Sequence, residues 1–299
     1  MQPEPGSQPT EALLRQLFEA DGGAVPLSFE LFPPQTETRR ENLNETVDRL
    51  APVAGDGFSV TMGAGGTTRT GTHDTAVEVA RRSGRPVTAH LTALGLSEAQ
   101  VLEAADGFWT AGITRVLALR GDRPRGSAGP LPPGFDHASD VVAALAARHP
   151  FELSVAAYPE KHPAAETLSE DIDHLKEKLD AGASRAYCQF VLDPAAYGRF
   201  IEACARHGID APIIPGLMPL EGWTRLRGFA RSNGTRIPDW LDRLFAAGTD
   251  TPELMPHLAA AATVEQARRL IAYGAPALHV YSMNRWPLSL AVARLLGHA

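Results

Sequence analysis

The feature that most constrains the fold is a unit that recurs along almost the whole chain, in which a short apolar run is followed by a loop and a helical pattern. The apolar runs cover residues 25–31, 57–62, 86–91, 113–119, 151–157, 185–190, 212–217 and 277–281. The helical patterns cover residues 38–50, 72–83, 97–111, 137–148, 168–181, 194–207, 221–231 and 287–296. Nearly continuous apolar strands that alternate with helices indicate a parallel sheet covered on both faces.

Eight such units in 299 residues predict an α/β protein with a single (β/α)8 TIM barrel. We expect residues 1–22 to form an N-terminal tail with a short helix, and residues 23–299 to form the catalytic barrel. Extra helices at about 237–246 and 252–273 are expected before the last strand. An open doubly wound sheet is the alternative, but the turn Gly63-Ala-Gly-Gly-Thr-Thr lacks the third glycine of a dinucleotide-binding motif.

Composition argues against several classes of protein. The net charge of -7 is unlike the basic balance of a nucleic-acid-binding surface. No apolar run approaches the roughly 20 residues that a membrane helix needs, and the N-terminus lacks the basic start and apolar core of a signal peptide. Cys188 and Cys204 form no disulfide pattern, and neither they nor the histidines show metal-ligand spacing. We therefore expect a cytoplasmic protein without a metal site.

The first predicted strand contains an acid in an apolar setting. In Leu27-Ser-Phe-Glu-Leu-Phe-Pro-Pro, the residues Ser28, Glu30 and Phe32 share one face of the strand, and the apolar residues share the other. If both faces are covered, Glu30 is a buried acid that must be paired, protonated or functional. An edge-strand glutamate that points to water is the alternative, and the strand alone does not decide between them.

Polar residues also mark the ends of the other strands, where TIM-barrel enzymes place their chemistry. The residues at these ends are Glu30, Thr61, His90, the turn Arg120-Gly121-Asp122, Tyr158, Gln189 and the pair Asn284-Arg285. Apolar sequence around Glu30 would favour its neutral, proton-donating form, whereas Arg120 and Arg123 should keep Asp122 ionised. Such a division between two acids is typical of an active site, although Asp122 on its own is equally explained as a loop cap.

The helix predicted at 168–181 carries a polar stripe beside its apolar face. Asp171, His174 and Lys178 follow a spacing of three and seven residues. A carboxylate, an imidazole and an ammonium in this order can bind the ribose hydroxyls and phosphates of a nucleotide. A solvated helix face is the commoner explanation of such a stripe. Taken alone, these patterns predict a barrel enzyme with two acids at its rim and a possible nucleotide ligand.

Several of these segments resemble the motifs of one family, the bacterial methylenetetrahydrofolate reductases. The resemblance begins with Ser28-Phe-Glu-Leu-Phe-Pro-Pro and runs in family order to about residue 285. Further segments that carry it are Ser59-Val-Thr-Met-Gly-Ala-Gly-Gly, Ala89-His-Leu-Thr, Ala118-Leu-Arg-Gly-Asp, Ser154-Val-Ala-Ala-Tyr-Pro-Glu-Lys-His-Pro, Leu175-Lys-Glu-Lys-Leu-Asp-Ala-Gly-Ala, Gln189-Phe, Ile213-Ile-Pro-Gly-Leu-Met-Pro and Tyr281-Ser-Met-Asn-Arg. As a set, these motifs are highly specific.

The resemblance implies a TIM-barrel flavoprotein that uses NADH or NADPH to reduce FAD, which then reduces 5,10-methylenetetrahydrofolate to 5-methyltetrahydrofolate. It makes Glu30 the general acid toward N10 of the folate and Asp122 a catalytic residue that contacts the pterin. Gln189 and Arg285 match folate-binding residues, and Trp223 is aligned with a phenylalanine that stacks with the nicotinamide. The residues that match FAD contacts are Thr61, His90, Arg120, Gly121, Asp122, Ala156, Tyr158, His162, Asp171, His174 and Lys178. Family members assemble as dimers or tetramers, which predicts a homo-oligomer.

The chain departs from the family pattern at three places. Met62 replaces a tyrosine, Arg69-Thr70-Gly71 lacks an aspartate, and Tyr187-Cys188 replaces a smaller pair. We expect Cys188 to face the helices, since its neighbours should face the lumen. Two other functions stay open from the sequence: a folate-dependent methyl or one-carbon transferase without a flavin redox step, and a non-catalytic folate or flavin binder.

Overall fold

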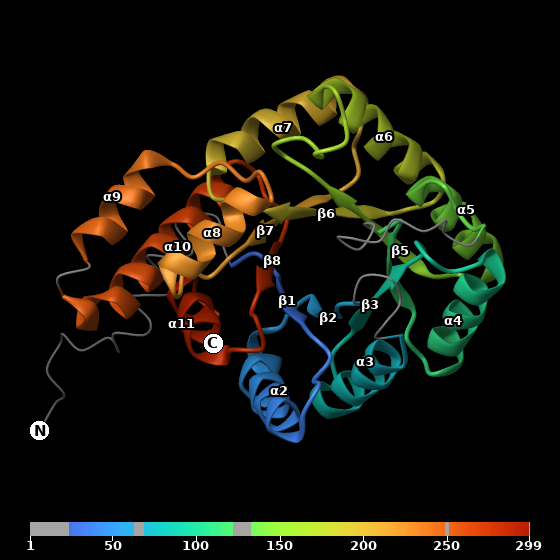
Figure 1. Cartoon of the computed structure of the whole chain (residues 1–299), viewed down its shortest axis with the longest axis horizontal. Coiled ribbons are helices and arrows are strands. Elements are labelled where there is room, and N and C mark those ends of the chain that lie inside the picture. Colours follow the sequence, from blue (N-terminus) through green and yellow to red (C-terminus); the bar gives the residue numbers. More distant parts are fainter. Residues whose placement is uncertain (1–23, 63–68, 122–132, 249–250, 299) are drawn as a thin grey trace, which may run out of the picture.

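The computed structural model describes residues 24–62, 69–121, 133–248 and 251–298, and in it eight parallel strands close into a barrel (Figure 1). The strands are β1 (Leu27–Leu31), β2 (Gly57–Val60), β3 (Val87–Thr92), β4 (Arg115–Leu119), β5 (Glu152–Ala157), β6 (Arg185–Phe190), β7 (Ile213–Leu217) and β8 (Leu278–Tyr281). Each strand pairs with the next, and β8 pairs with β1 from Leu27↔Leu278 to Glu30↔Tyr281. The predicted TIM barrel is confirmed.

Helices surround the barrel. They are α2 (Glu37–Leu50), α3 (Arg69–Ser83), α4 (Glu98–Thr110), α5 (Ala138–Arg148), α6 (Leu168–Asp180), α7 (Pro194–Arg206), α8 (Trp223–Ser232), α9 (Asp239–Ala247), α10 (Met255–Ala272) and α11 (Trp286–Leu295). No helix in the described ranges is long and apolar enough to cross a membrane. The predicted tail and helix of residues 1–22 lie outside the described residues.

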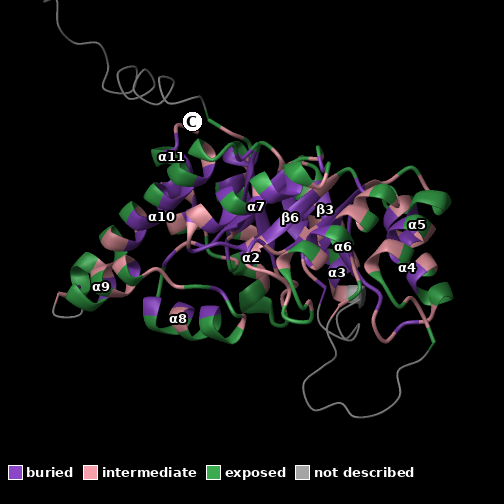
Figure 2. Cartoon of the chain, turned by 90° about the horizontal axis from the view of Figure 1, so that it is seen from above, coloured by how far each residue is buried: buried purple, intermediate pink, exposed green. Residues whose placement is uncertain are grey.

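The helix that completes the ring after β7 is α10. It contacts β7, α7 and α11, whereas α8 lies away from the ring, at the lower edge of Figure 2. The sequence pattern placed α8 in the ring after β7 and treated α10 as an additional helix. The structure shows the reverse. The reason is tertiary: α8, α9 and α10 share a second apolar cluster that includes Trp223, Leu241 and Phe245. This cluster holds α8 beside the mouth of the barrel.

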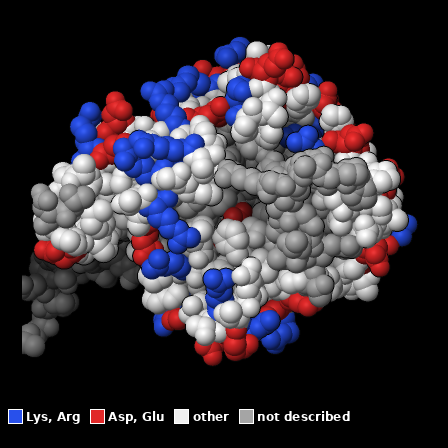
Figure 3. All heavy atoms as spheres, viewed as in Figure 1, with Lys and Arg blue, Asp and Glu red and all other residues white. Residues whose placement is uncertain are grey.

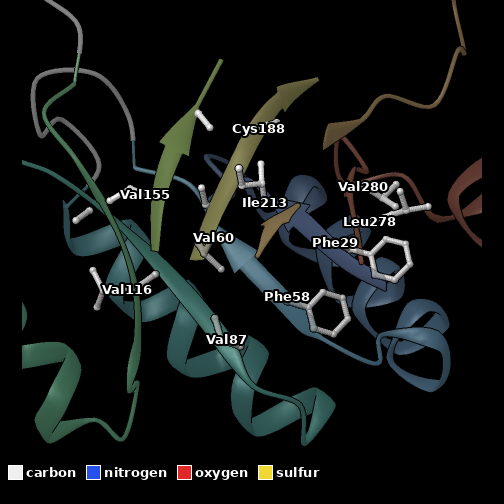
Figure 4. Packing of buried hydrophobic residues seen from close by; sticks show 14 of the residues in the cluster. Phe29, Phe58, Val60, Val87, Val116, Val155, Cys188, Ile213, Leu278 and Val280 are labelled. Carbon is white, nitrogen blue, oxygen red and sulfur yellow. The ribbon is translucent and has the colours of Figure 1, made fainter. Parts of the chain in front are cut away.

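The main core lies between the strands and the helices. Alternate strand residues such as Phe29, Phe58 and Cys188 point outward into it (Figure 4), and the rings of Phe29 and Phe58 lie 6.1 Å apart. The other strand residues point into the lumen, because successive side chains of a strand face opposite sides. The predicted outward orientation of Cys188 is therefore confirmed. Its thiol is buried, which raises its pKa well above the ordinary value and makes it a poor nucleophile.

The lumen contains a charged layer at the amino ends of the strands. Asp56, just before β2, accepts hydrogen bonds from Arg115 at 3.2 Å and Arg185 at 3.3 Å. Glu152 binds the same two guanidinium groups from β5, and the Tyr187 hydroxyl reaches Asp56 at 3.4 Å. This layer, named here the basal network, closes the end of the barrel opposite the predicted active site.

Candidate active site

Glu30 lies between two histidines near the carboxyl end of β1. Its Oε2 atom is 3.7 Å from Nε2 of His279 on β8 and 3.9 Å from Nε2 of His90 on β3. All three side chains are buried. Because β1 is paired on both edges, the edge-strand alternative is excluded. Glu30 is a buried acid within ion-pair distance of two imidazoles.

Two serine hydroxyls hold the His279 ring in place. Its Nδ1 atom lies 2.7 Å from Ser28 Oγ, and its Nε2 atom lies 3.4 Å from Ser59 Oγ. A hydroxyl can donate or accept, so this pair supports either neutral tautomer of the ring. The Tyr187 ring packs against the imidazole, with 4.7 Å between the ring centroids. His279, the nearer of the two histidines to Glu30, is thus itself fixed on several sides.

His279 is not among the residues predicted from the sequence, although β8 contains a signal for it. In β8 the apolar residues Leu278 and Val280 alternate with His279 and Tyr281. A period of two places both polar side chains in the lumen, beside the residues of β1. This alternation is only four residues long, and the residues predicted at this strand end are Asn284 and Arg285.

Burial keeps the His90 imidazole neutral. It lowers the pKa of His90 to about 4, while the nearby Glu30 carboxylate acts in the opposite direction and the neighbouring His279 also lowers it. The Nε2 atom of His90 has no hydrogen-bond partner among the described residues. A buried polar atom without a partner is costly. A ligand that enters the site can supply the missing partner, which fits the prediction that His90 contacts a cofactor.

A cavity of about 360 Å³ opens over the carboxyl ends of β4 and β5 and along α6. Its walls contain most of the residues predicted to bind FAD, namely Arg120, Gly121, Ala156, Tyr158, His162, Asp171, His174 and Lys178. Two others, Thr61 and His90, lie at the ends of β2 and β3, outside this cavity. Asp122, the remaining predicted contact, lies outside the described residues.

Two side chains of α6 point into the wall of this cavity, where Asp171 is buried and Lys178 is half-buried. The Asp171 carboxylate accepts a hydrogen bond from the backbone N–H of His162 at 2.9 Å. The Lys178 ammonium donates to the Ala156 carbonyl at 2.6 Å, and burial lowers the pKa of Lys178 to about 8, against the effect of nearby Asp171. His174 is half exposed and pairs with Glu177 at 3.2 Å. Of the polar stripe on this helix, His174 therefore lies on a solvent-exposed face, whereas Asp171 and Lys178 do not.

The turn after β4 approaches the neighbouring strand closely. Gly121 has a φ of +89°, and a Cβ atom there would lie 2.2 Å from Cγ2 of Thr92. A side chain at this position would be strained and would clash. Met62, one of the departures from the family pattern, fills the space nearby and accepts a contact from the Thr92 N–H through its sulfur at 3.2 Å. Thr61 is joined to β1 by its N–H, which donates to the Leu31 carbonyl at 2.9 Å.

The predicted folate-binding residues lie outside this cavity, with Gln189 on β6 and Arg285 after β8. Gln189 is half-buried on the lumen side of β6, where its Oε1 atom accepts from the Phe190 N–H at 3.0 Å. Arg285 is exposed and forms an ion pair of 2.8 Å with Glu221. Figure 3 shows that the surface is hollowed here, with Lys and Arg gathered beside the hollow over α8. The arrangement suits a ligand with an anionic end.

The structure does not bring Trp223 to the mouth. Its side chain is buried in the cluster under α8, where the indole stacks on Phe245 with 4.6 Å between the ring centroids. Trp223 begins the helix, and its first turn packs toward α9. Phe229, one and a half turns further along, is 47% exposed and stacks on Phe190 at 5.5 Å. The aromatic ring that α8 offers to a ligand is therefore Phe229, which the sequence analysis missed.

A family model and the relatives in sequence agree on one family. The family model for methylenetetrahydrofolate reductase matches residues 14–297. The chain is 37% identical to the 5,10-methylenetetrahydrofolate reductase of Pectobacterium carotovorum over 96% of this chain and 95% of that protein. It is 36% identical to the 5,10-methylenetetrahydrofolate reductase of Escherichia coli, with the same coverage.

A solved structure shares the fold at much lower identity. It is an uncharacterized protein from Clostridium thermocellum that binds two copies of 5-methyl-5,6,7,8-tetrahydrofolic acid. The identity is 16%, the TM-score is 0.60, and the match covers 95% of this chain and 98% of that one. At this identity the likeness concerns the fold alone. On the family match and the near full-length identity to its curated members, the chain belongs to the methylenetetrahydrofolate reductase family.

Proposed function

We propose that this enzyme reduces 5,10-methylenetetrahydrofolate to 5-methyltetrahydrofolate, with NADH or NADPH as the electron donor and FAD as the bound carrier. Family membership supports the overall reaction. The observation that carries the assignment to this site is the buried Glu30 carboxyl between His279 and His90. At the same end of the barrel, a cavity over β4, β5 and α6 has the buried Asp171 carboxylate and the half-buried Lys178 ammonium in its walls.

Glu30 is suited to the proton transfer that the folate requires. The substrate contains a five-membered ring that bridges N5 and N10, and N10 leaves poorly unless it receives a proton. A buried carboxylic acid between two imidazoles can donate that proton in the transition state. Opening of the ring leaves a cationic iminium at N5, which accepts the hydride. His279, which Ser28 and Ser59 hold in place, lies 3.7 Å from the carboxyl and helps to set its position.

The residues of the cavity fit a flavin dinucleotide. Asp171 offers a carboxylate to ribose hydroxyls, and Lys178 and Arg120 offer positive charge to the diphosphate. The unpartnered Nε2 atom of His90 is one polar group that a bound flavin can satisfy. FAD, when bound, supplies two-electron chemistry that accepts hydride from the nicotinamide and passes it to the folate. Asp122 keeps its proposed place in this site through the resemblance.

The remaining predicted residues account for recognition of the two substrates. Gln189, on the lumen side of β6, offers an amide to the pterin, and Arg285 offers a guanidinium to the folate carboxylates. We assign the aromatic contact with the nicotinamide to Phe229 in place of Trp223, since only Phe229 has an exposed ring. The same half of the mouth would then serve the donor and the folate in turn, as a two-step reaction through one carrier requires.

The visible absorption spectrum tests the proposal directly. We expect the purified protein to be yellow, to be bleached by NADH or NADPH without oxygen, and to regain its colour when methylenetetrahydrofolate is added. A protein that neither binds added FAD nor oxidises NADH or NADPH would overturn the proposal. If tetrahydrofolate and a methyl donor gave methyltetrahydrofolate without any reductant, the transferase alternative would replace it.

The Glu30→Gln variant tests the role of the acid. Glutamine has nearly the same shape but cannot donate the proton, so we expect folate reduction to fall by at least about a hundredfold. Reduction of the flavin by NADH needs no acid at this position and should change by less than about threefold. Rapid-mixing spectroscopy measures the two half-reactions separately. Equal loss of both half-reactions would contradict the assigned role.

A further inference from the structure

The side chain of Asn284 continues the sheet after the strands have ended. Pairing between β1 and β8 runs to Glu30↔Tyr281, and beyond that point the chain of β8 turns away. Phe32, just past the end of β1, therefore has an N–H and a C=O that β8 does not pair. The Asn284 Oδ1 atom accepts from that N–H at 2.8 Å, and its Nδ2 atom donates to that C=O at 2.9 Å. One carboxamide thus replaces a neighbouring strand.

The turn that brings Asn284 to this position is strained. Met283 and Asn284 both have positive φ, at 55° and 54°. Asparagine tolerates this conformation better than most residues, whereas a long side chain such as methionine seldom adopts it. Strained backbone persists where the surroundings hold it in place, and it occurs most often at functional sites. Here the two side-chain bonds to Phe32 hold it, together with a bond from Thr46 Oγ1 to the Asn284 carbonyl at 3.0 Å.

The same turn carries groups of the proposed active site. Arg285 follows directly, and its N–H donates to the Ser282 carbonyl at 2.9 Å. The Ser282 hydroxyl in turn donates to the carbonyl of Glu30 at 2.6 Å. The turn is therefore bonded to β1 at Glu30 and again at Phe32, on either side of Leu31. Arg285 is exposed, and its side chain forms an ion pair with Glu221 on the rim. Its place therefore depends on the backbone of this turn.

We propose that Asn284 is a positioning residue, whose carboxamide fixes Arg285 at a set distance from Glu30 so that one folate molecule reaches both. The inference rests on the proposed function, because it gives Arg285 the folate carboxylates and Glu30 the N10 atom. Asn284 itself has no proposed contact with the folate. Its effect is exerted through the backbone of residues 282–285, which it joins to the end of β1.

The test compares two glycine substitutions in the FAD-loaded enzyme. Asn284→Gly accepts the positive φ but removes both bonds to Phe32, and we expect it to raise the KM for methylenetetrahydrofolate about tenfold or more. Met283→Gly relaxes the neighbouring position and keeps the bonds, so its KM should stay within about twofold of wild type. The rate of flavin reduction by NADH should change by less than about twofold in both variants. Equal KM values in the two variants would overturn the proposal.

Two further measurements separate positioning from a loss of structure. In the Arg285→Ala background, adding Asn284→Gly should raise the KM by less than about twofold. The guanidinium that Asn284 positions is already absent there, so the two effects are not additive. A full tenfold increase there would show that Asn284 does not act through Arg285. Hydrogen exchange at the Phe32 amide should be about tenfold faster in Asn284→Gly than in wild type; an unchanged rate would also overturn the proposal. This exchange rate needs no folate, so a wild-type enzyme that failed to reduce folate would refute the proposed function separately.

Discussion

The half-buried ammonium of Lys178 gives the proposed cofactor site a dependence on pH. Its pKa is lowered to about 8, chiefly by burial, so in the empty site it is mostly charged at pH 7 and mostly neutral at pH 9. A phosphate bound beside it would favour the charged form. Binding of FAD should therefore weaken as the pH rises through 8, by about tenfold between pH 7 and pH 9.

Fluorescence titration of the apoprotein with FAD measures this dependence. Lys178→Arg keeps a positive charge throughout the range, so its dissociation constant should vary little with pH. Lys178→Met should bind FAD weakly and equally at pH 7 and pH 9. If Lys178→Met kept the pH dependence of the wild type, another group would be responsible and the phosphate role of Lys178 would be wrong.

Single residues differed in how well the sequence predicted them. Glu30 was selected because an acid in an apolar strand stands out from its neighbours, and the structure buries it. His279 was not selected, because its partners Ser28, Ser59 and Glu30 are about 220 residues or more away along the chain. Spacing shows which face of a strand a side chain occupies. It does not show which strands become neighbours. His279 meets Ser28 and Glu30 only because β8 pairs with β1 when the barrel closes.

At the level of elements, the packing of α8 decides which of its two aromatic rings is exposed to a ligand. The strands and helices that the structure describes lie within a few residues of their predicted positions, since their apolar periodicity is strong. The orientation of α8 could not be read in the same way. Its contacts with α9 and α10 decide which aromatic ring is buried, and those contacts belong to a cluster assembled from residues 190–262. Trp223 fills that cluster, which leaves Phe229 at the surface.

Two substitutions on α8 distinguish the aromatic residues. Phe229→Leu removes an exposed ring and should raise the KM for NADH about fivefold, the equivalent of roughly 1 kcal/mol of stacking. Trp223→Phe keeps an aromatic ring against Phe245; it should leave that KM nearly unchanged and lower the stability. Steady-state kinetics and thermal unfolding measure the two effects. A larger KM effect for Trp223→Phe would restore the original assignment to Trp223.

At the level of the whole molecule, the barrel separates stability from chemistry. Predicted functional residues occupy the carboxyl ends of the strands, and the basal network occupies the amino ends. The number of strand and helix units was enough to predict the closed barrel. The network was not predicted, since Asp56, Arg115, Glu152 and Arg185 stand at the starts of four separate units and resemble ordinary charged residues near loops. Only closure of the sheet brings them together.

The basal network should therefore affect unfolding without affecting catalysis. The Asp56 side chain is 12% exposed and receives bonds from Arg115 and Arg185, so Asp56→Asn leaves two guanidinium groups with less negative charge. We expect a loss of about 2 kcal/mol in the free energy of unfolding, from denaturant titration, with unchanged KM values. Asp48→Asn is the matched control, because Asp48 binds Arg82 through two bonds at the surface and should cost less than about 1 kcal/mol. Equal losses in the two variants, or a changed KM in Asp56→Asn, would mean that the two ends of the barrel are not independent.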